Sequence, residues 1–249
     1  MKISLTFILI IFSLVFALSQ RNHFIELSDN ITTVTKEISN FNKVSATDDF
    51  KVFITFSKNQ ESLKIEANEN LHEYIIVKKE NGVLKLSTQN YSHNHKNSSK
   101  EHLVAYITAK HLNAIQGHDD AEIELTNMLK TTTLNIDLDD DAVLKGKIRV
   151  DNLTIDLDDD AELDLEGNVK EMKARVNGDS KITGYRLETH NLNIKLMDDS
   201  DARLTVTGQI NVTARHDSQF TYKGSGKIIK EQTSGDAEVE HKEYYNKQD

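Results

Sequence analysis

An aspartate followed by alanine or serine recurs along the second half of this chain, and that repeat constrains the fold more than any other feature. The seven pairs are nearly evenly spaced: Asp120-Ala121, Asp141-Ala142, Asp160-Ala161, Asp179-Ser180, Asp201-Ala202, Asp217-Ser218 and Asp236-Ala237. Two neighbouring segments, IDLDDDAVL (136–144) and IDLDDDAEL (155–163), are almost identical. A repeat of about 20 residues with alternating apolar positions predicts a β-solenoid in which each repeat forms one coil.

The apolar residues of each repeat predict which side chains point inside. Leu153, Ile155 and Leu157 alternate with polar residues, and a period of two places them on one face of a strand. The alanine or serine after each aspartate is expected at a corner, where only a small side chain fits against the coils above and below. Seven coils stacked ~4.8 Å apart predict a rod roughly 34 Å long.

Residues 20–109 lack the repeat but contain similar alternating runs, namely DFKVFITF, SLKIEA and YIIVKKENGVLKLS. Asn81-Gly82 in the last run is a strong signal of a two-residue hairpin. We expect this N-terminal β section to cap the solenoid, because an uncapped end exposes unpaired strand edges. The predicted organisation is all-β, with a capping section over 20–109, solenoid repeats over 110–240 and a disordered tail over 241–249.

The first residues, MKISLTFILIIFSLVFALSQ, have the features of a secretory signal peptide. Lys2 supplies the positive charge, an apolar run follows, and Ala17-Leu18-Ser19 is a small-x-small cleavage site. An uncleaved N-terminal anchor is the alternative, although the run is shorter than the ~20 residues that span a bilayer. We predict a signal peptide over 1–19 and an exported mature chain without a transmembrane segment. Its predicted location is the periplasm, the outer cell surface or the extracellular space.

The chain is acidic, with 30 Lys/Arg against 40 Asp/Glu and a formal net charge of −10. Residues 119–166 alone hold 16 Asp/Glu and only 4 Lys/Arg. Such a surface repels nucleic acid and anionic lipid, so neither is predicted as a partner. Cations, basic proteins and neutral glycans remain compatible with it. Cysteine is absent, which excludes disulfides and thiolate metal sites.

Aspartate runs at two neighbouring corners supply the candidate binding residues: Asp139, Asp140, Asp141, Asp158, Asp159 and Asp160. Stacked coils bring the two runs one above the other, and calcium prefers clusters of carboxylate oxygens. In the alternative interpretation these aspartates bond their own backbone in turns and are otherwise solvated. The GGxGxDxUx repeat of calcium-loaded β-rolls is absent. No cofactor is therefore required by the sequence, and calcium is the candidate ion.

Catalytic motifs are missing, since the sequence has no nucleophile elbow, phosphate-binding loop or zinc-hydrolase helix. A glycoside hydrolase needs two carboxylates opposed across a cleft. Here the acidic residues recur evenly along the rod and do not converge on one point. The sequence therefore predicts a protein that is not an enzyme.

The order of these segments resembles a known family. FNKVSATDDFKVFITF opens the region, SLKIEANENLHEYIIVKKENGVLKLS follows, and stacked short coils come next, with a small residue after each aspartate. Over roughly 38–240 the chain is similar to the putative auto-transporter adhesin family with the head GIN domain, found in secreted proteins of Bacteroidetes-type bacteria. The resemblance implies a right-handed, single-stranded β-solenoid with a β-rich start. It also implies export and an adhesive role without an assigned catalytic set.

These features together predict an exported, non-catalytic binding or adhesion module of the bacterial envelope, which presents an acidic solenoid surface to a protein or glycan partner. One alternative is a carbohydrate-active enzyme, a polysaccharide lyase or hydrolase on a β-solenoid. Another is a purely structural envelope protein. A single cleft with opposed carboxylates favours the enzyme, whereas uniform acidic faces favour the binding module. No oligomeric state is predicted.

Overall fold

The structure is a computed structural model, which describes residues 23–89, 91–93 and 100–243. The predicted signal peptide, residues 1–19, lies outside these ranges, as does the end of the chain after residue 243. Within the described ranges, no helix is long and apolar enough to cross a membrane.

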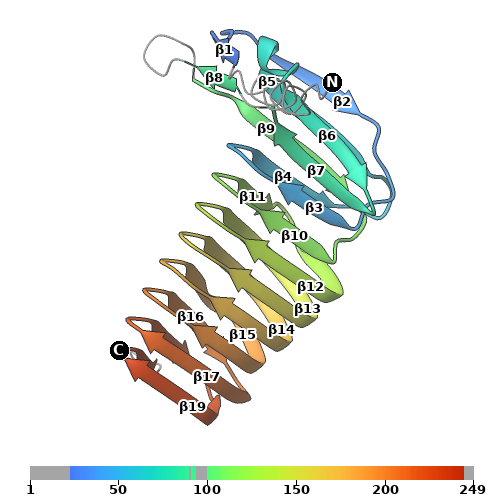
Figure 1. Cartoon of the computed structure of the whole chain (residues 1–249). Helices are drawn as coiled ribbons and strands as arrows, with labels where there is room; N and C mark the ends of the chain where they lie inside the picture. Colours follow the sequence, from blue (N-terminus) through green and yellow to red (C-terminus); the bar gives the residue numbers. More distant parts are fainter. Residues whose placement is uncertain (1–22, 90, 94–99, 244–249) are drawn as a thin grey trace, which may run out of the picture.

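The chain folds into a β-solenoid of about seven turns, whose stacked coils run from green to red in Figure 1. β13 pairs in parallel with β14 from Val143 opposite Glu162 to Leu157 opposite Val176, so that partners lie one sequence repeat apart. The predicted stack of β-coils is confirmed. Its strands are β10 (Ala114–Gly117), β11 (Glu122–Leu125), β12 (Leu129–Leu138), β13 (Val143–Leu157), β14 (Glu162–Val176), β15 (Lys181–Leu196), β16 (Asp201–Val206), β17 (Gln209–His216), β18 (Gln219–Lys223), β19 (Lys227–Gly235) and β20 (Glu238–His241).

The interior of the solenoid is the one that the alternation predicts. Ile155, Leu157 and Leu163 are at most 1% exposed. Each packs against the coils before and after it, and burying such a side chain contributes about 1.5–3 kcal/mol. Stability therefore accrues from contacts between neighbouring coils.

One predicted corner is displaced toward the N-terminus. The repeat predicts a corner at Asp201-Ala202, but both residues lie inside strand β16, where Ala202 pairs with Ile182. The corner is Asp199-Ser200, and Ser200 is fully buried. Asp199-Ser200 and Asp201-Ala202 both match the pattern of aspartate before a small residue, so the sequence cannot choose between them. The prediction is wrong because pairing with β15 decides which of the two forms the corner. With this correction the spacing between successive corners is more even than the sequence pattern alone suggests.

The N-terminal section extends the stack by two further layers. β3 (Lys43–Ala46) and β4 (Lys51–Phe56) pair in parallel with β10 and β11. β7 (Val83–Thr88) and β9 (Leu103–Ala109) pair in parallel with β3 and β4 in turn. Parallel stacking therefore starts before residue 110.

Antiparallel strands cover the edges of these upper layers. β5 (Ser62–Asn68) pairs with β9, and β2 (Ile31–Lys36) pairs with β5. β6 (Ile75–Glu80) pairs with β7 through the predicted hairpin. Its turn residues Asn81 and Gly82 have φ of 51° and 78°, and two positive values are the requirement of a type I′ turn. A 3₁₀ turn (Glu69–Leu71) follows β5, and β1 (His23–Ile25) pairs separately with β8 (Tyr91–His93).

The opposite end of the solenoid is built differently. β19 and β20 pair on one side with β17 and β18, and no strand of the described chain pairs with their outer edges. Val212 and Ala214 are buried in β17, whereas their register partners Glu231 and Thr233 in β19 are exposed. A charge at an interior position of an end strand discourages edge-to-edge association.

Candidate functional site

Each corner turns through one residue in the left-handed conformation, with φ between 55° and 75°: Asp48, Asp119, Asp140, Asp159, Gly178, Asp198, His216 and Gly235. Glycine adopts this conformation freely, and aspartate does so more readily than most residues. The residue that follows is an aspartate at all eight corners. These eight exposed residues are termed the aspartate ridge: Asp49, Asp120, Asp141, Asp160, Asp179, Asp199, Asp217 and Asp236.

The first corner of the ridge, Asp48-Asp49-Phe50, escapes the sequence pattern because Phe50 is not small. Phe50 is nevertheless fully buried and lies above Ala121 in the next coil, since its carbonyl accepts the backbone N–H of Glu122 at 2.9 Å. The Asp-Asp pair ahead of the alternating run FKVFITF is the signal that could have identified this corner.

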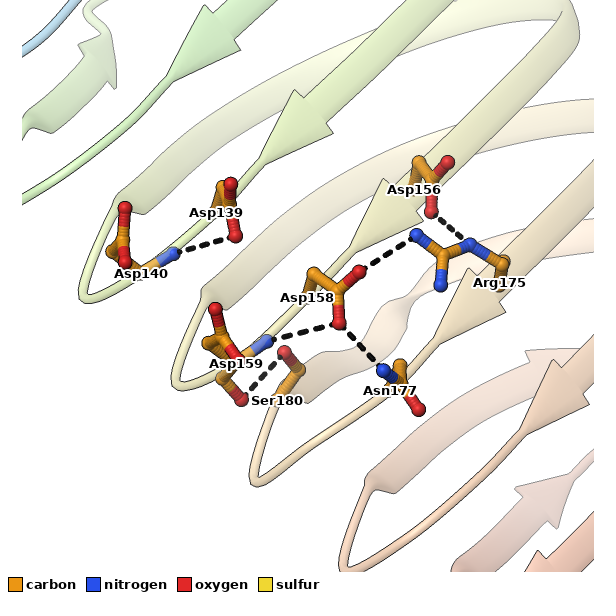
Figure 2. A network of polar contacts seen from close by, with 8 residues as sticks. All are labelled: Asp139, Asp140, Asp156, Asp158, Asp159, Arg175, Asn177 and Ser180. Carbon is orange, nitrogen blue, oxygen red and sulfur yellow. Dashed lines mark hydrogen bonds and ion pairs between the residues drawn. The ribbon is translucent and has the colours of Figure 1, made fainter.

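Three of the predicted binding residues bring their carboxylates together as a group at two successive corners (Figure 2). Asp139, Asp140 and Asp159 each offer one oxygen, and these oxygens lie within 4.8 Å of one another. Asp139 Oδ1 also accepts the backbone N–H of Asp140 at 3.0 Å, as the turn interpretation expects. Loss of hydration raises the pKa of Asp159, and repulsion from Asp139, Asp158 and Asp140 raises it further. Calcium prefers six to eight oxygens, so calcium binding by this group stays a prediction.

Asp158, predicted for the same site, faces the next coil instead. Its Oδ1 accepts Asn177 Nδ2 at 2.6 Å, and its Oδ2 accepts Arg175 Nη2 at 2.9 Å. The hydrogen bond from Asn177, followed by that from Arg175, holds the pKa of Asp158 below its usual range. Asp141 and Asp160 belong to the aspartate ridge and lie outside the group of three. The structure thus brings together three of the six predicted residues.

Outward side chains at equivalent positions of successive coils form a column beside this corner. The charge of this column changes from negative to positive at Arg175. Asp137 pairs in register with Asp156, and Asp156 pairs with Arg175. Arg175 Nε lies 2.5 Å from Asp156 Oδ1, so the column carries its own counter-charge. The column then continues with Lys195, Thr213 and Gln232.

A hollow of about 610 Å³ lies over this column, on strands β14, β15, β17 and β19. The described residues that line it include no aspartate or glutamate. A smaller hollow of about 220 Å³ continues along the same side toward Thr154 and shares Arg175 and Lys195 with it. The basic residues of both hollows are termed the cationic face: Lys173, Arg175, Lys195, Arg215 and Lys230. Sequence reasoning missed this set because its members come from four strands and meet only through strand register.

The comparisons with known proteins agree with this architecture. The profile of the family described as "Putative auto-transporter adhesin, head GIN domain" matches residues 40–226. The chain belongs to this family. The resemblance noted in the sequence is confirmed, and membership of the head GIN family supports an exported module for adhesion or binding. No curated protein sequence matches the chain.

Solved structures share the fold of this head GIN family member. A "putative adhesin" from Bacteroides fragilis is 21% identical with a TM-score of 0.78, over 88% of this chain and 99% of the other. A "putative adhesin" from Parabacteroides merdae is 17% identical with a TM-score of 0.70, over 88% and 99%. A "putative lipid binding protein" from Parabacteroides distasonis is 17% identical with a TM-score of 0.69, again over 88% and 99%. At these identities the likeness establishes the fold alone.

Proposed function

We propose that this protein is an exported, non-catalytic binding module of the bacterial envelope, which engages a protein or a glycan through the sides of its solenoid. The observation that carries the proposal is the repetition of outward side chains in columns along the stack. Each coil presents an equivalent position ~4.8 Å from the last. A row of equivalent side chains at this spacing suits an extended partner that contacts several coils at once.

The solenoid also suits binding because its side chains are already held in place. Outward residues such as Arg175 and Lys195 stand on strands that are paired on both sides. Little backbone entropy is lost when such a surface meets a partner, which favours affinity.

The aspartate ridge and the described lining of the larger hollow lack the geometry of a glycan hydrolase. Hydrolysis requires a pair of carboxylates flanking the scissile bond. The ridge aspartates instead run in a line along one edge, and the described residues that line the larger hollow offer no such pair. These observations support the binding module over the hydrolase.

The aspartate ridge gives one edge of the molecule a negative potential. Eight exposed carboxylates stand at successive coils, and such a row attracts basic groups and repels anionic ones. A protein partner that approaches this edge is therefore expected to be basic. The ridge accordingly supplies the acidic surface of the proposed module.

The test is a pull-down from envelopes of the producing bacterium with the immobilised mature chain, beginning at Gln20. One arm treats the extract with protease, which leaves glycans, and the other with periodate, which destroys their vicinal diols. We expect a saturable partner to survive in one arm, and heat-denatured chain is the control. Retention of no partner in either arm contradicts a binding module. Shortening of a retained glycan by the folded chain contradicts the non-catalytic assignment.

A further inference from the structure

Positive charge gathers on one side of this acidic protein. The whole chain has a formal net charge of −10, yet residues 170–230 contain 11 Lys/Arg against 7 Asp/Glu. Within the cationic face, Arg175 is already neutralised by two aspartates. The other four side chains stand on exposed residues and have no ion-pair partner among the described residues: Lys173, Lys195, Arg215 and Lys230. Four unneutralised cations beside one pair of hollows mark a place for an anionic ligand.

We propose that the cationic face is a binding groove for an acidic glycan, a polysaccharide with a carboxylate on some of its sugars. This inference rests on the proposed binding function and specifies the chemical class of the partner. The glycan chain would run along the solenoid axis and contact successive coils.

The register of the strands supplies the repeating geometry. Two neighbouring columns cross β14, β15, β17 and β19: Lys173, Asn193, Asn211 and Lys230 in one, and Arg175, Lys195, Thr213 and Gln232 in the other. Parallel strands lie ~4.8 Å apart, which is close to the length of one sugar ring in an extended polysaccharide. Each sugar therefore meets a fresh pair of side chains.

The chemistry of the two columns matches both parts of such a ligand. Lysine and arginine form charge-assisted hydrogen bonds with carboxylates, which are stronger than neutral ones. Asn193, Asn211 and Gln232 carry amides that donate and accept at once, and sugar hydroxyls require both. Cationic side chains interleaved with amides therefore favour an anion that carries many hydroxyl groups over an anion that carries none.

Other polyanions fit this surface less well. Single-stranded nucleic acid is held by stacking its bases on aromatic side chains, and none occurs among the described residues that line the two hollows. Ridge residues Asp179, Asp199 and Asp217 stand at the corners of the same coils. They would repel a dense polyphosphate or an anionic bilayer. A glycan with widely spaced carboxylates avoids that repulsion.

The test measures binding of the mature chain to a fluorescent hyaluronan oligosaccharide, which carries a carboxylate on every second sugar, by anisotropy, beside a neutral oligosaccharide of equal length. Lys195→Glu/Arg215→Glu is expected to weaken binding of the hyaluronan oligosaccharide by about tenfold or more. The matched control is Lys130→Glu/Arg149→Glu, which makes the same charge change at two exposed register partners outside both hollows. We expect this control to stay within about twofold of the wild type, because distant exposed charges are screened by salt.

Folding of each variant is checked by circular dichroism and melting temperature. Should the Glu double variant fail to fold, Lys195→Gln/Arg215→Gln removes the two charges without reversing them and carries the same expectation of weaker binding. Unchanged binding by the folded variant overturns the inference. Equal binding of the neutral oligosaccharide also overturns it, as does tighter binding of an oligonucleotide or of phosphatidylglycerol vesicles.

The inference and the proposed function fail in distinguishable ways. If the wild type does not bind the hyaluronan oligosaccharide while the envelope pull-down still retains a partner, the acidic-glycan inference is overturned and the binding module stands. If the pull-down retains nothing as well, the binding module is rejected too.

Discussion

Arg175 lies one coil below Asp156 in the same outward column and binds its carboxylate, with Nε 2.5 Å from Asp156 Oδ1. The same guanidinium reaches Asp158 Oδ2 at 2.9 Å. This residue is the boundary between an acidic part of the column and a cationic part. The two kinds of surface are therefore separated by strand register within one continuous solenoid.

The neighbouring residues Asp158 and Asp159 are predicted to affect the stability of the fold in opposite directions. The pKa of Asp158 is lowered in the fold, so its ionised form stabilises the protein above the unfolded pKa of ~3.9, and this contribution is lost as pH falls through the folded value. Asp158→Asn should cost about 1 kcal/mol at neutral pH, because the pair is partly exposed. Below the folded pKa of Asp158 the difference from the wild type should vanish.

Asp159→Asn is the matched control. The pKa of Asp159 is raised, so ionised Asp159 is destabilising above the folded pKa, and protonation relieves that penalty in acid. Asparagine also tolerates the left-handed conformation of this position. We expect a slightly higher melting temperature than the wild type at neutral pH. Melting curves from about pH 2 to neutral pH check both variants. A loss of stability at neutral pH in Asp159→Asn equal to that in Asp158→Asn contradicts the assignment.

Buried positions inside the coils should tolerate no charged side chain. Ile155 is 1% exposed, so Ile155→Ala is expected to cost about 2–5 kcal/mol, and Ile155→Asp should prevent folding because a buried unpaired carboxylate costs still more. Thr154→Asp is the control, since the adjacent Thr154 is exposed. Urea denaturation measures the free energies of unfolding. A stable Ile155→Asp protein is the result that contradicts the inside and outside assignment.

The corner serines provide a finer test of packing. Ser180, Ser200 and Ser218 are all fully buried. Ser180 Oγ donates to the carbonyl of Asp159 at 3.0 Å, and Ser218 Oγ accepts the N–H of Arg215 at 3.0 Å. Ser200 Oγ has no hydrogen-bond partner among the described residues. Ser200→Ala should therefore stabilise the protein by about 1 kcal/mol, whereas Ser180→Ala should destabilise it by about as much. Thermal unfolding of the two variants tests this prediction. Equal shifts of the melting temperature with the same sign refute the interpretation.

Calcium binding at Asp139, Asp140 and Asp159 remains a prediction of the sequence with a direct test. Calorimetric titration of the mature chain with calcium should give heat and raise the melting temperature, because an ion that binds only the folded state stabilises it. Asp140→Asn/Asp159→Asn should abolish both signals, and Asp217→Asn, on the ridge far from this group, should leave them intact. Absence of heat and of any melting shift in the wild-type chain rejects the site.

Much of the candidate site follows from local sequence, and the rest depends on pairing. Aspartate before a small residue predicts most corners, because a left-handed turn and a buried small side chain are local requirements. The pattern fails at Asp201-Ala202, where a second, equally good pair lies just before it and only hydrogen bonding to β15 selects Asp199-Ser200. It also fails at Phe50, because the neighbours of that corner, such as Ala121, lie far away in the sequence.

The sequence by itself determined the coil, its interior and its family, because the alternation within a strand and the repeat between strands are properties of the chain alone. Only the tertiary structure decided which charges become neighbours. Lys195 and Arg215 belong to different strands, β15 and β17, and line the same hollow, because interstrand hydrogen bonds set the register. Register therefore separates an acidic edge from a cationic face in a chain whose net charge predicts a uniformly acidic surface.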